Sequence, residues 1–86
     1  MFTHIHFSKS FGKKFTKLPK YVQEKFKSRI EIFSNEPLAR ELRNHKLKPP
    51  FMGVRSIDIT GDYRALYVES DGIVEFFDIG THSQLY

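Results

Sequence analysis

The chain has 86 residues, enough for one domain with a small core, and its nine Phe and four Tyr let it bury much apolar area per residue. It has no cysteine, which excludes disulfides and thiolate metal sites, and no apolar run approaches the length of a membrane span. We therefore expect a single cytoplasmic domain over residues 1–86, with no signal peptide and no membrane partner.

The net charge of +4 is unevenly distributed along the chain. Residues 1–55 carry thirteen Lys and Arg against four Asp and Glu, whereas residues 56–86 carry one against six. The basic part is suited to a polyanion such as nucleic acid or to an acidic protein, and the alternative is a solvated helical face.

The first residues predict a half-buried strand. Polar and apolar side chains alternate over Phe2–Phe7, which places His4 and His6 on one face. Two histidines at this spacing are weak evidence for a metal ion, and the simpler role is the solvent side of a strand. We expect no metal site.

Two short helices follow and form a hairpin. Ser8 or Ser10 can cap the first helix, Pro19 ends it and begins the second, and the hairpin ends near residues 34–37. One further turn is expected over Leu38–Arg43, with Leu38 and Leu42 facing inward. The apolar stripes are Phe11, Phe15 and Leu18 in the first helix, and Val22, Phe26, Ile30 and Phe33 in the second.

The second half predicts an antiparallel meander after a basic loop over residues 44–50. Its strands are Val54–Thr60, Tyr63–Glu69 and Ile73–Ile79, with turns at residues 61–62 and 71–72. A short tail, Gly80–Tyr86, leaves the last strand. The expected fold is α+β in the order β-α-α-β-β-β, with the helical hairpin on one face of a mostly antiparallel sheet.

This topology brings several polar residues to one end of the sheet. Asp62 lies in the turn before the middle strand of the meander and Arg64 begins that strand, beside His82 at the end of the last strand. His45 lies in the loop that feeds the first strand and could reach either end of the sheet. A guanidinium, an imidazole and a carboxylate suit a phosphodiester. RNA cleavage needs only such groups, because the 2′-hydroxyl is a built-in nucleophile, so no cofactor is expected. The alternative for Asp62 and Arg64 is a surface salt bridge.

Three segments, taken in order, resemble the RelE/ParE superfamily of type II toxins. They are Gly53–Ile59, Gly61–Tyr67 and Gly80–Tyr86. The Asn44-His45-Lys46-Leu47 segment and the closing Gly-Thr-His-x-x-Leu-aromatic pattern resemble the YafQ branch in particular. The resemblance covers nearly the whole chain. It implies a RelE-like fold, a ribosome-dependent endoribonuclease that cuts mRNA on the 70S ribosome, and inhibition by a cognate antitoxin.

The resemblance also implies site residues. His45, Asp62, His82 and Tyr86 match the YafQ pattern, and Arg64 matches an arginine of the RelE branch. The implied roles are proton transfer for the two histidines, phosphate binding for Arg64, orientation of a histidine for Asp62 and base stacking for Tyr86.

Other residues have supporting roles or depart from the family pattern. Arg55 and Asp58 are candidate supporting residues. Asp58 stands where YafQ-like sequences have a histidine, and Ser56 where they have an aspartate. Basic side chains are expected to bind ribosomal RNA phosphates. These are Lys9, Lys13, Lys14, Lys17, Lys46 and Lys48.

Two other functions are open at this point. One is inhibition of DNA gyrase by a toxin of the same fold, as in the ParE branch, although His45 and His82 together count against it. The other is a non-catalytic module that binds RNA or an acidic protein through its basic helices. Because an active toxin must enter the ribosome free of its inhibitor, we expect the active form to be a monomer.

Overall fold

The computed structural model describes residues 4–86, and its elements follow the expected order with two additions. The elements are β1 (His4–Phe7), α1 (Lys9–Thr16), α2 (Lys20–Asn35), the 3₁₀ turn η1 (Arg40–Leu42), β2 (His45–Lys46), β3 (Arg55–Asp58), β4 (Tyr63–Ser70), β5 (Ile73–Thr81) and α3 (His82–Leu85). The short strand β2 and the terminal helix α3 were not expected. Phe2 and Thr3, which belong to the expected first strand, lie outside the described residues.

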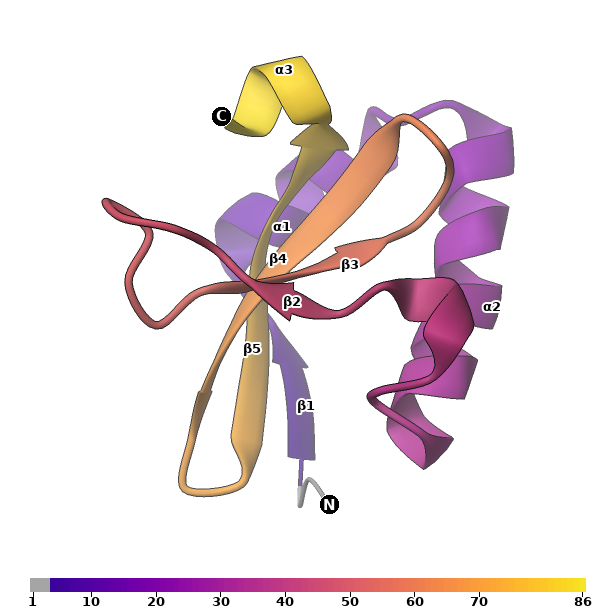
Figure 1. Ribbon diagram of the computed structural model, residues 1–86. Coiled ribbons are helices and arrows are strands. Elements are labelled where there is room, and N and C mark those ends of the chain that lie inside the picture. The colour runs from indigo at the N-terminus through magenta and orange to yellow at the C-terminus, as the bar shows by residue number, and fades with distance from the viewer. Residues whose placement is uncertain (1–3) are drawn as a thin grey trace.

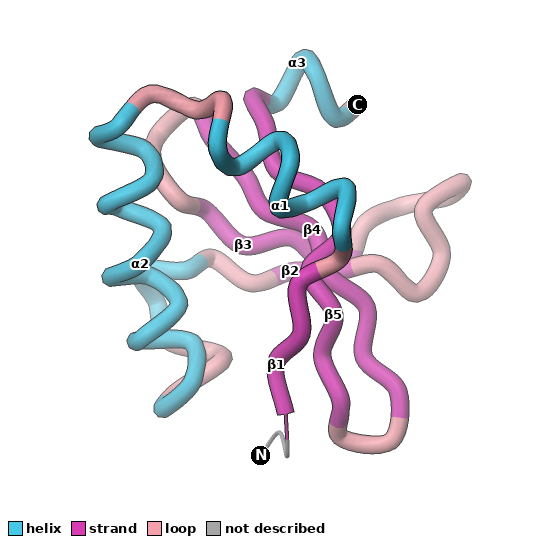
Figure 2. Tube along the Cα trace, turned by 180° about the vertical axis from the view of Figure 1, so that it is seen from behind, coloured by secondary structure: helices cyan, strands magenta, loops and turns pink. Residues whose placement is uncertain are grey.

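The strands form one sheet in the order β1-β5-β4-β3-β2 (Figure 1). β1 is parallel to β5, and the other neighbouring pairs are antiparallel. Seen from behind, α1 and α2 lie together in front of the sheet (Figure 2). The expected α+β fold is therefore confirmed, with the first strand at the edge of the sheet beside the last one and a helical hairpin on one face.

Aromatic side chains fill the space between the helices and the sheet. Phe76 of β5 lies at the centre of this core, with its ring centroid 6.2 Å from that of Phe11, 5.3 Å from that of Phe33 and 5.1 Å from that of Tyr67. Ser8 starts α1, since its hydroxyl accepts a hydrogen bond from the Phe11 N–H at 3.1 Å. The stripe of large rings predicted from the helical period is therefore the core itself.

Two local expectations were wrong. Leu42 is fully buried, but Leu38 has 73% of its surface exposed, because the helical turn begins only at Arg40. β5 also runs on to Thr81, so Gly80 lies inside a strand and pairs with Arg64. In the part of the chain that the structure describes, no helix is long and apolar enough to cross a bilayer.

Asn44 ties the segment before β2 to the sheet. Its side-chain amide donates hydrogen bonds to the Tyr67 hydroxyl at 2.8 Å and to the Pro37 carbonyl at 3.0 Å. Its oxygen accepts one from Arg55 Nε at 2.8 Å. Burial raises the pKa of the Tyr67 hydroxyl above 10.0, an effect that Asn44 and Arg55 partly offset. This partly buried network fixes the chain immediately before His45.

We predict that Tyr67 makes the fold sensitive to alkali. The folded protein holds the phenol proton to higher pH than the unfolded chain does, so its contribution to stability is complete below pH 10 and is lost as the pH rises through the raised pKa. The Tyr67→Phe variant should be less stable at pH 7 by about 1 kcal/mol, because Asn44 loses an acceptor. Its stability should then fall less steeply above pH 10 than that of the wild type.

Urea unfolding between pH 7 and 11 measures both effects. Tyr21→Phe is the matched control, since Tyr21 is 63% exposed and should retain the wild-type pH dependence. Equal alkaline slopes for all three proteins would contradict the assignment to Tyr67.

Candidate active site

A cleft of about 450 Å³ lies on the face of the sheet opposite the helical hairpin, between α3 and the loop that joins β2 to β3. Four basic side chains and one carboxylate line it together with two histidines and several apolar groups. The lining residues are Arg43, His45, Lys46, Leu47, Lys48, Pro49, Phe51, Asp58, Arg64, His82 and Tyr86. The cleft therefore combines an excess of positive charge with an apolar and aromatic wall.

The terminal helix α3 begins with the cleft residue His82 and is followed by Tyr86, and a capping box holds it in place. The Thr81 hydroxyl accepts a hydrogen bond from the Gln84 N–H at 3.3 Å, and the Gln84 side chain accepts one from the Thr81 N–H at 2.8 Å. A Cβ atom on Gly80 would lie 2.8 Å from Gln84 Oε1. Glycine at this position leaves room for the Gln84 side chain in its capping position, and the expected open tail is instead a helical turn folded back over the strand.

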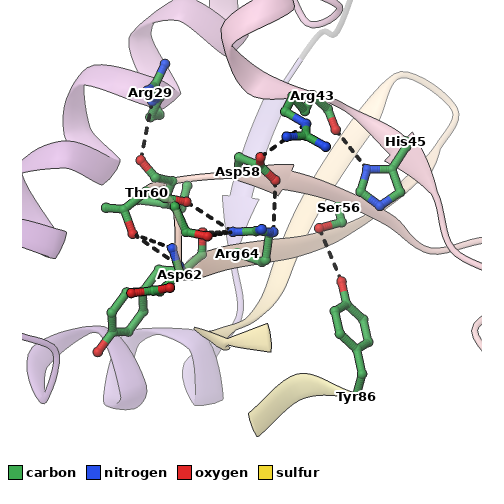
Figure 3. A network of polar contacts seen from close by, with 12 residues as sticks. Arg29, Arg43, His45, Ser56, Asp58, Thr60, Asp62, Arg64 and Tyr86 are labelled. Carbon is green, nitrogen blue, oxygen red and sulfur yellow. Dashed lines mark hydrogen bonds and ion pairs between the residues drawn. The ribbon is translucent and has the colours of Figure 1, made fainter. Parts of the chain in front are cut away.

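The last residue forms one wall of the cleft. The Tyr86 hydroxyl donates a hydrogen bond to the buried Ser56 hydroxyl at 3.3 Å. Its ring lies edge-on to the His82 ring, with 4.7 Å between centroids, and edge-on to Phe51 at 5.8 Å. Ser56 is therefore the anchor of the terminal aromatic ring (Figure 3).

His45 lies on β2 with a defined ring orientation. It pairs with Ser56 of β3, and its Nδ1 lies 2.8 Å from the Arg43 carbonyl oxygen. A carbonyl oxygen can only accept a hydrogen bond, so Nδ1 carries the proton and Nε2 of the neutral ring has a free lone pair. Arg43 directs this carbonyl from a left-handed backbone conformation, φ 46° and ψ 46°, which is unusual for a residue with a side chain.

Asp58 and Arg64 face each other across β3 and β4 and are only 15% and 18% exposed. Asp58 Oδ1 lies 2.9 Å from Arg64 Nε. Nη1 of the same guanidinium donates to the carbonyl oxygens of Thr60, Gly61 and Tyr63 at 3.0 to 3.1 Å. Arg64 is therefore a fixed cation whose Nε and Nη1 are already occupied by protein groups.

The carboxylate of Asp62 does not join this cleft. Figure 3 shows Asp62 on the far side of Arg64 from His45 and Tyr86. It lines a separate hollow, and within residues 4–86 its carboxylate has no hydrogen bond or ion pair. Asp62 contributes instead through its main chain, because its carbonyl accepts a hydrogen bond from the His82 N–H at 3.2 Å. The carboxylate inside the cleft belongs to Asp58.

The remaining predicted residues divide between the two faces of the sheet. Lys46 and Lys48 line the cleft. Lys9, Lys13 and Lys14 lie on α1 behind the sheet, with Lys17 at its C-terminal cap, and Lys14 pairs with Asp78. Arg55 shares the helical face with its cross-strand partner Tyr67 and lies outside the cleft lining. Of the predicted site residues, the cleft lining includes His45, Asp58, Arg64, His82 and Tyr86.

Arg43 and Phe51 line the cleft, but the sequence analysis did not predict them there. Arg43 gave no periodic signal, because it lies before β2 in a left-handed conformation to which strand alternation does not apply. His6 of the other histidine pair lies near Glu75, with 3.5 Å between Nε2 and Oε2, and is not part of the cleft. Within residues 4–86 no group of three or more histidines and carboxylates could hold a metal ion.

We predict that the two aspartates differ in their effect on stability. Asp58→Asn removes the charged partner of Arg64, and the free energy of unfolding should fall by about 2 kcal/mol. Asp62→Asn should change it by less than about 0.5 kcal/mol, because its exposed carboxylate has no partner within the described residues. Urea unfolding at pH 7 measures both values, and equal losses would contradict this placement of the ion pair.

We also predict that Gly80→Ala loosens α3. The new methyl group must displace the Gln84 side chain, which breaks its hydrogen bond to the Thr81 N–H. The Thr81 amide hydrogen should then exchange about fivefold faster, as expected for a loss of about 1 kcal/mol. Gly61→Ala is the matched control, because nothing lies within 4 Å of a Cβ there. Unchanged Thr81 exchange in Gly80→Ala would rule out this role for the glycine.

Comparison with known proteins places the chain in a family. The sequence profile described as "Bacterial toxin of type II toxin-antitoxin system, YafQ" matches residues 3–86. No curated protein sequence matches the chain.

Solved structures of toxins share the fold. The crystal structure of YafQ from E. coli strain BL21(DE3) is 24% identical, with a TM-score of 0.80 over 95% of this chain and 96% of that one. YafQ in the E. coli DinJ-YafQ toxin-antitoxin complex is 23% identical, with a TM-score of 0.78 over 95% and 94%. The archaeal RelE-RelB complex from Pyrococcus horikoshii OT3 gives 22% identity and a TM-score of 0.74 over 98% and 99%. The match of the YafQ profile over almost the entire sequence shows that this chain belongs to the YafQ family of type II toxins.

Proposed function

We propose that the protein is a metal-independent endoribonuclease that cleaves mRNA on the ribosome. The observation that carries this proposal is the pair of histidines, His45 and His82, which two separate elements bring to one cationic cleft. His45 has a free Nε2 lone pair in its neutral form. Two imidazoles beside an arginine can supply a base, an acid and charge neutralisation, which are the groups that RNA cleavage requires.

The reaction begins with removal of a proton from the 2′-hydroxyl by His45 Nε2. The 2′-oxygen attacks the adjacent phosphorus, and the bond between phosphorus and the 5′-oxygen breaks. Protonated His82 donates its proton to the leaving 5′-oxygen, which gives a 2′,3′-cyclic phosphate and a free 5′-hydroxyl. The fixed guanidinium of Arg64 neutralises negative charge on the phosphorane. No cofactor takes part in these steps.

The apolar wall of the cleft supports RNA binding. Tyr86 is 42% exposed and is held at its hydroxyl by Ser56, so one face of its ring can stack on a nucleobase. Lys46 and Lys48 on the rim can contact the phosphates of the same strand. The lysines of α1 lie on the other face of the sheet, where they can bind ribosomal RNA phosphates without choosing a sequence.

A cognate antitoxin is the proposed inhibitor. Two of the similar structures are complexes, DinJ with YafQ from E. coli and RelE with RelB from Pyrococcus horikoshii. An antitoxin with acidic segments would offset the positive charge of this chain. We propose that the free, active toxin is a cytoplasmic monomer, as entry into the ribosome requires release of the inhibitor.

The proposal predicts that both histidines are needed for cleavage. His45→Ala and His82→Ala should each slow mRNA cleavage on purified 70S ribosomes by about a hundredfold or more, because each removes a proton-transfer group. His6→Ala is the matched control and should retain wild-type activity, since His6 is outside the cleft. Rates come from single-turnover assays with labelled mRNA.

Full cleavage by both variants of the cleft histidines would refute this assignment. In cells, expression should stop translation and leave the DNA intact. A DNA-damage response with continued translation would instead favour inhibition of DNA gyrase.

A further inference from the structure

Arg43 is the more exposed of the two arginines that line the cleft, and within residues 4–86 it has one ionic contact. Its side chain is 78% exposed, and its Nε lies 3.6 Å from Asp58 Oδ2, well beyond a strong hydrogen-bond distance. Arg64 differs in every respect, since it is 18% exposed and has a 2.9 Å contact to the same carboxylate together with three carbonyl contacts. Of the two guanidiniums, only that of Arg43 can leave its partner at low cost.

The carboxylate that Arg43 would leave stays neutralised. Asp58 binds Arg64 through Oδ1 and Arg43 through Oδ2, so departure of Arg43 leaves the Arg64 ion pair intact. A carboxylate that is mostly shielded from solvent is strongly destabilising when it has no partner, and this is avoided here because Arg64 stays bound. Asp58 is therefore able to hold two arginines and release one.

The backbone of Arg43 keeps this side chain beside the reacting groups. Its carbonyl oxygen holds His45 Nδ1 at 2.8 Å, and its left-handed conformation directs that carbonyl to the histidine and the side chain to Asp58 (Figure 3). The arm thus starts next to the proposed base. Its planar guanidinium can bind two oxygens of one phosphate at once.

We infer that Arg43 is a phosphate-binding arm, held by Asp58 and transferred to a phosphate of the bound RNA strand. This inference rests on the proposed function and adds to it the group that grips the substrate. Arg64 remains the fixed cation of the site, whereas Arg43 supplies the contact that forms only with substrate. Asp58 is a positioning residue, because it acts through the two arginines.

A single-stranded deoxyribonucleotide decamer separates binding from cleavage, since it lacks the 2′-hydroxyl. We expect Arg43→Gln to weaken its binding about tenfold, as a charged fork is lost, and to reduce the slope of log Kd against log salt by about 0.7, the value for one phosphate contact on a single strand. Arg40→Gln is the matched control, because it removes the same charge from an exposed residue of η1 outside the cleft lining and should preserve the wild-type slope.

Arg43→Lys keeps the positive charge but loses the planar guanidinium that can bind two phosphate oxygens at once. It should retain the wild-type salt slope and recover only part of the affinity. Thermal unfolding should be the same for the wild type and the Arg43 variants within about 2 °C, since the side chain is exposed. Fluorescence anisotropy between 20 and 200 mM salt gives the affinities and slopes.

Three results would overturn the inference. The first is a wild-type affinity and salt slope in Arg43→Gln, and the second is an equal loss of affinity in Arg43→Gln and Arg40→Gln. The third is the absence of decamer binding by the wild type. Failure of the proposed function would give a different result. The protein would then bind the decamer in an Arg43-dependent way but would not cleave mRNA on ribosomes.

Discussion

The ion pair between Asp58 and Arg64 is the contact on which the arrangement of the cleft depends. It joins β3 to β4, and the Arg64 guanidinium extends it to three carbonyl oxygens of the turn between them. The same turn contains Asp62, whose carbonyl holds the main chain of His82. One nearly buried charge pair thus connects the middle of the sheet to the residue that begins α3. Because both partners are mostly desolvated, loss of one would leave the other without compensation.

Separate sets of contacts position the two histidines on opposite sides of the cleft. On one side, a strained residue fixes the ring of His45 through its carbonyl oxygen, so the direction of the free lone pair is set by the main chain. On the other side, the capping box and the Ser56 hydroxyl hold α3, which places His82 beside the aromatic ring of Tyr86. Each histidine therefore has its own support, and neither depends on the other for its position.

Much of the fold followed from periodicity in the sequence. The change from a helical period to alternation separated the hairpin from the meander, and the two turns of the meander fixed which strand ends lie together. That is why the proximity of Arg64 and the last strand was predictable, since Arg64 pairs with Gly80. The short elements were not predictable, because β2 has two residues and α3 has four, too few for a periodic signal.

The sequence pattern determines the direction of the Asp58 side chain but not that of Asp62. Asp58 lies within a strand, so alternation places its side chain on the same face as Ser56 and its cross-strand partner Arg64. Asp62 lies in the turn, where no period determines the direction of a side chain, so it was favoured only by its place at the end of the sheet and by the family resemblance. The expected burial of Leu38 was wrong for a similar reason, because Leu38 precedes the helical turn that was expected to contain it.

The central claim is that His45 removes a proton and His82 donates one at the same phosphodiester. The most direct measurement is the pH dependence of the single-turnover rate of mRNA cleavage on 70S ribosomes. The account predicts a bell-shaped profile for the wild type, loss of the acidic limb in the residual activity of His45→Ala and loss of the alkaline limb in that of His82→Ala. Profiles that keep both limbs in both variants would contradict it.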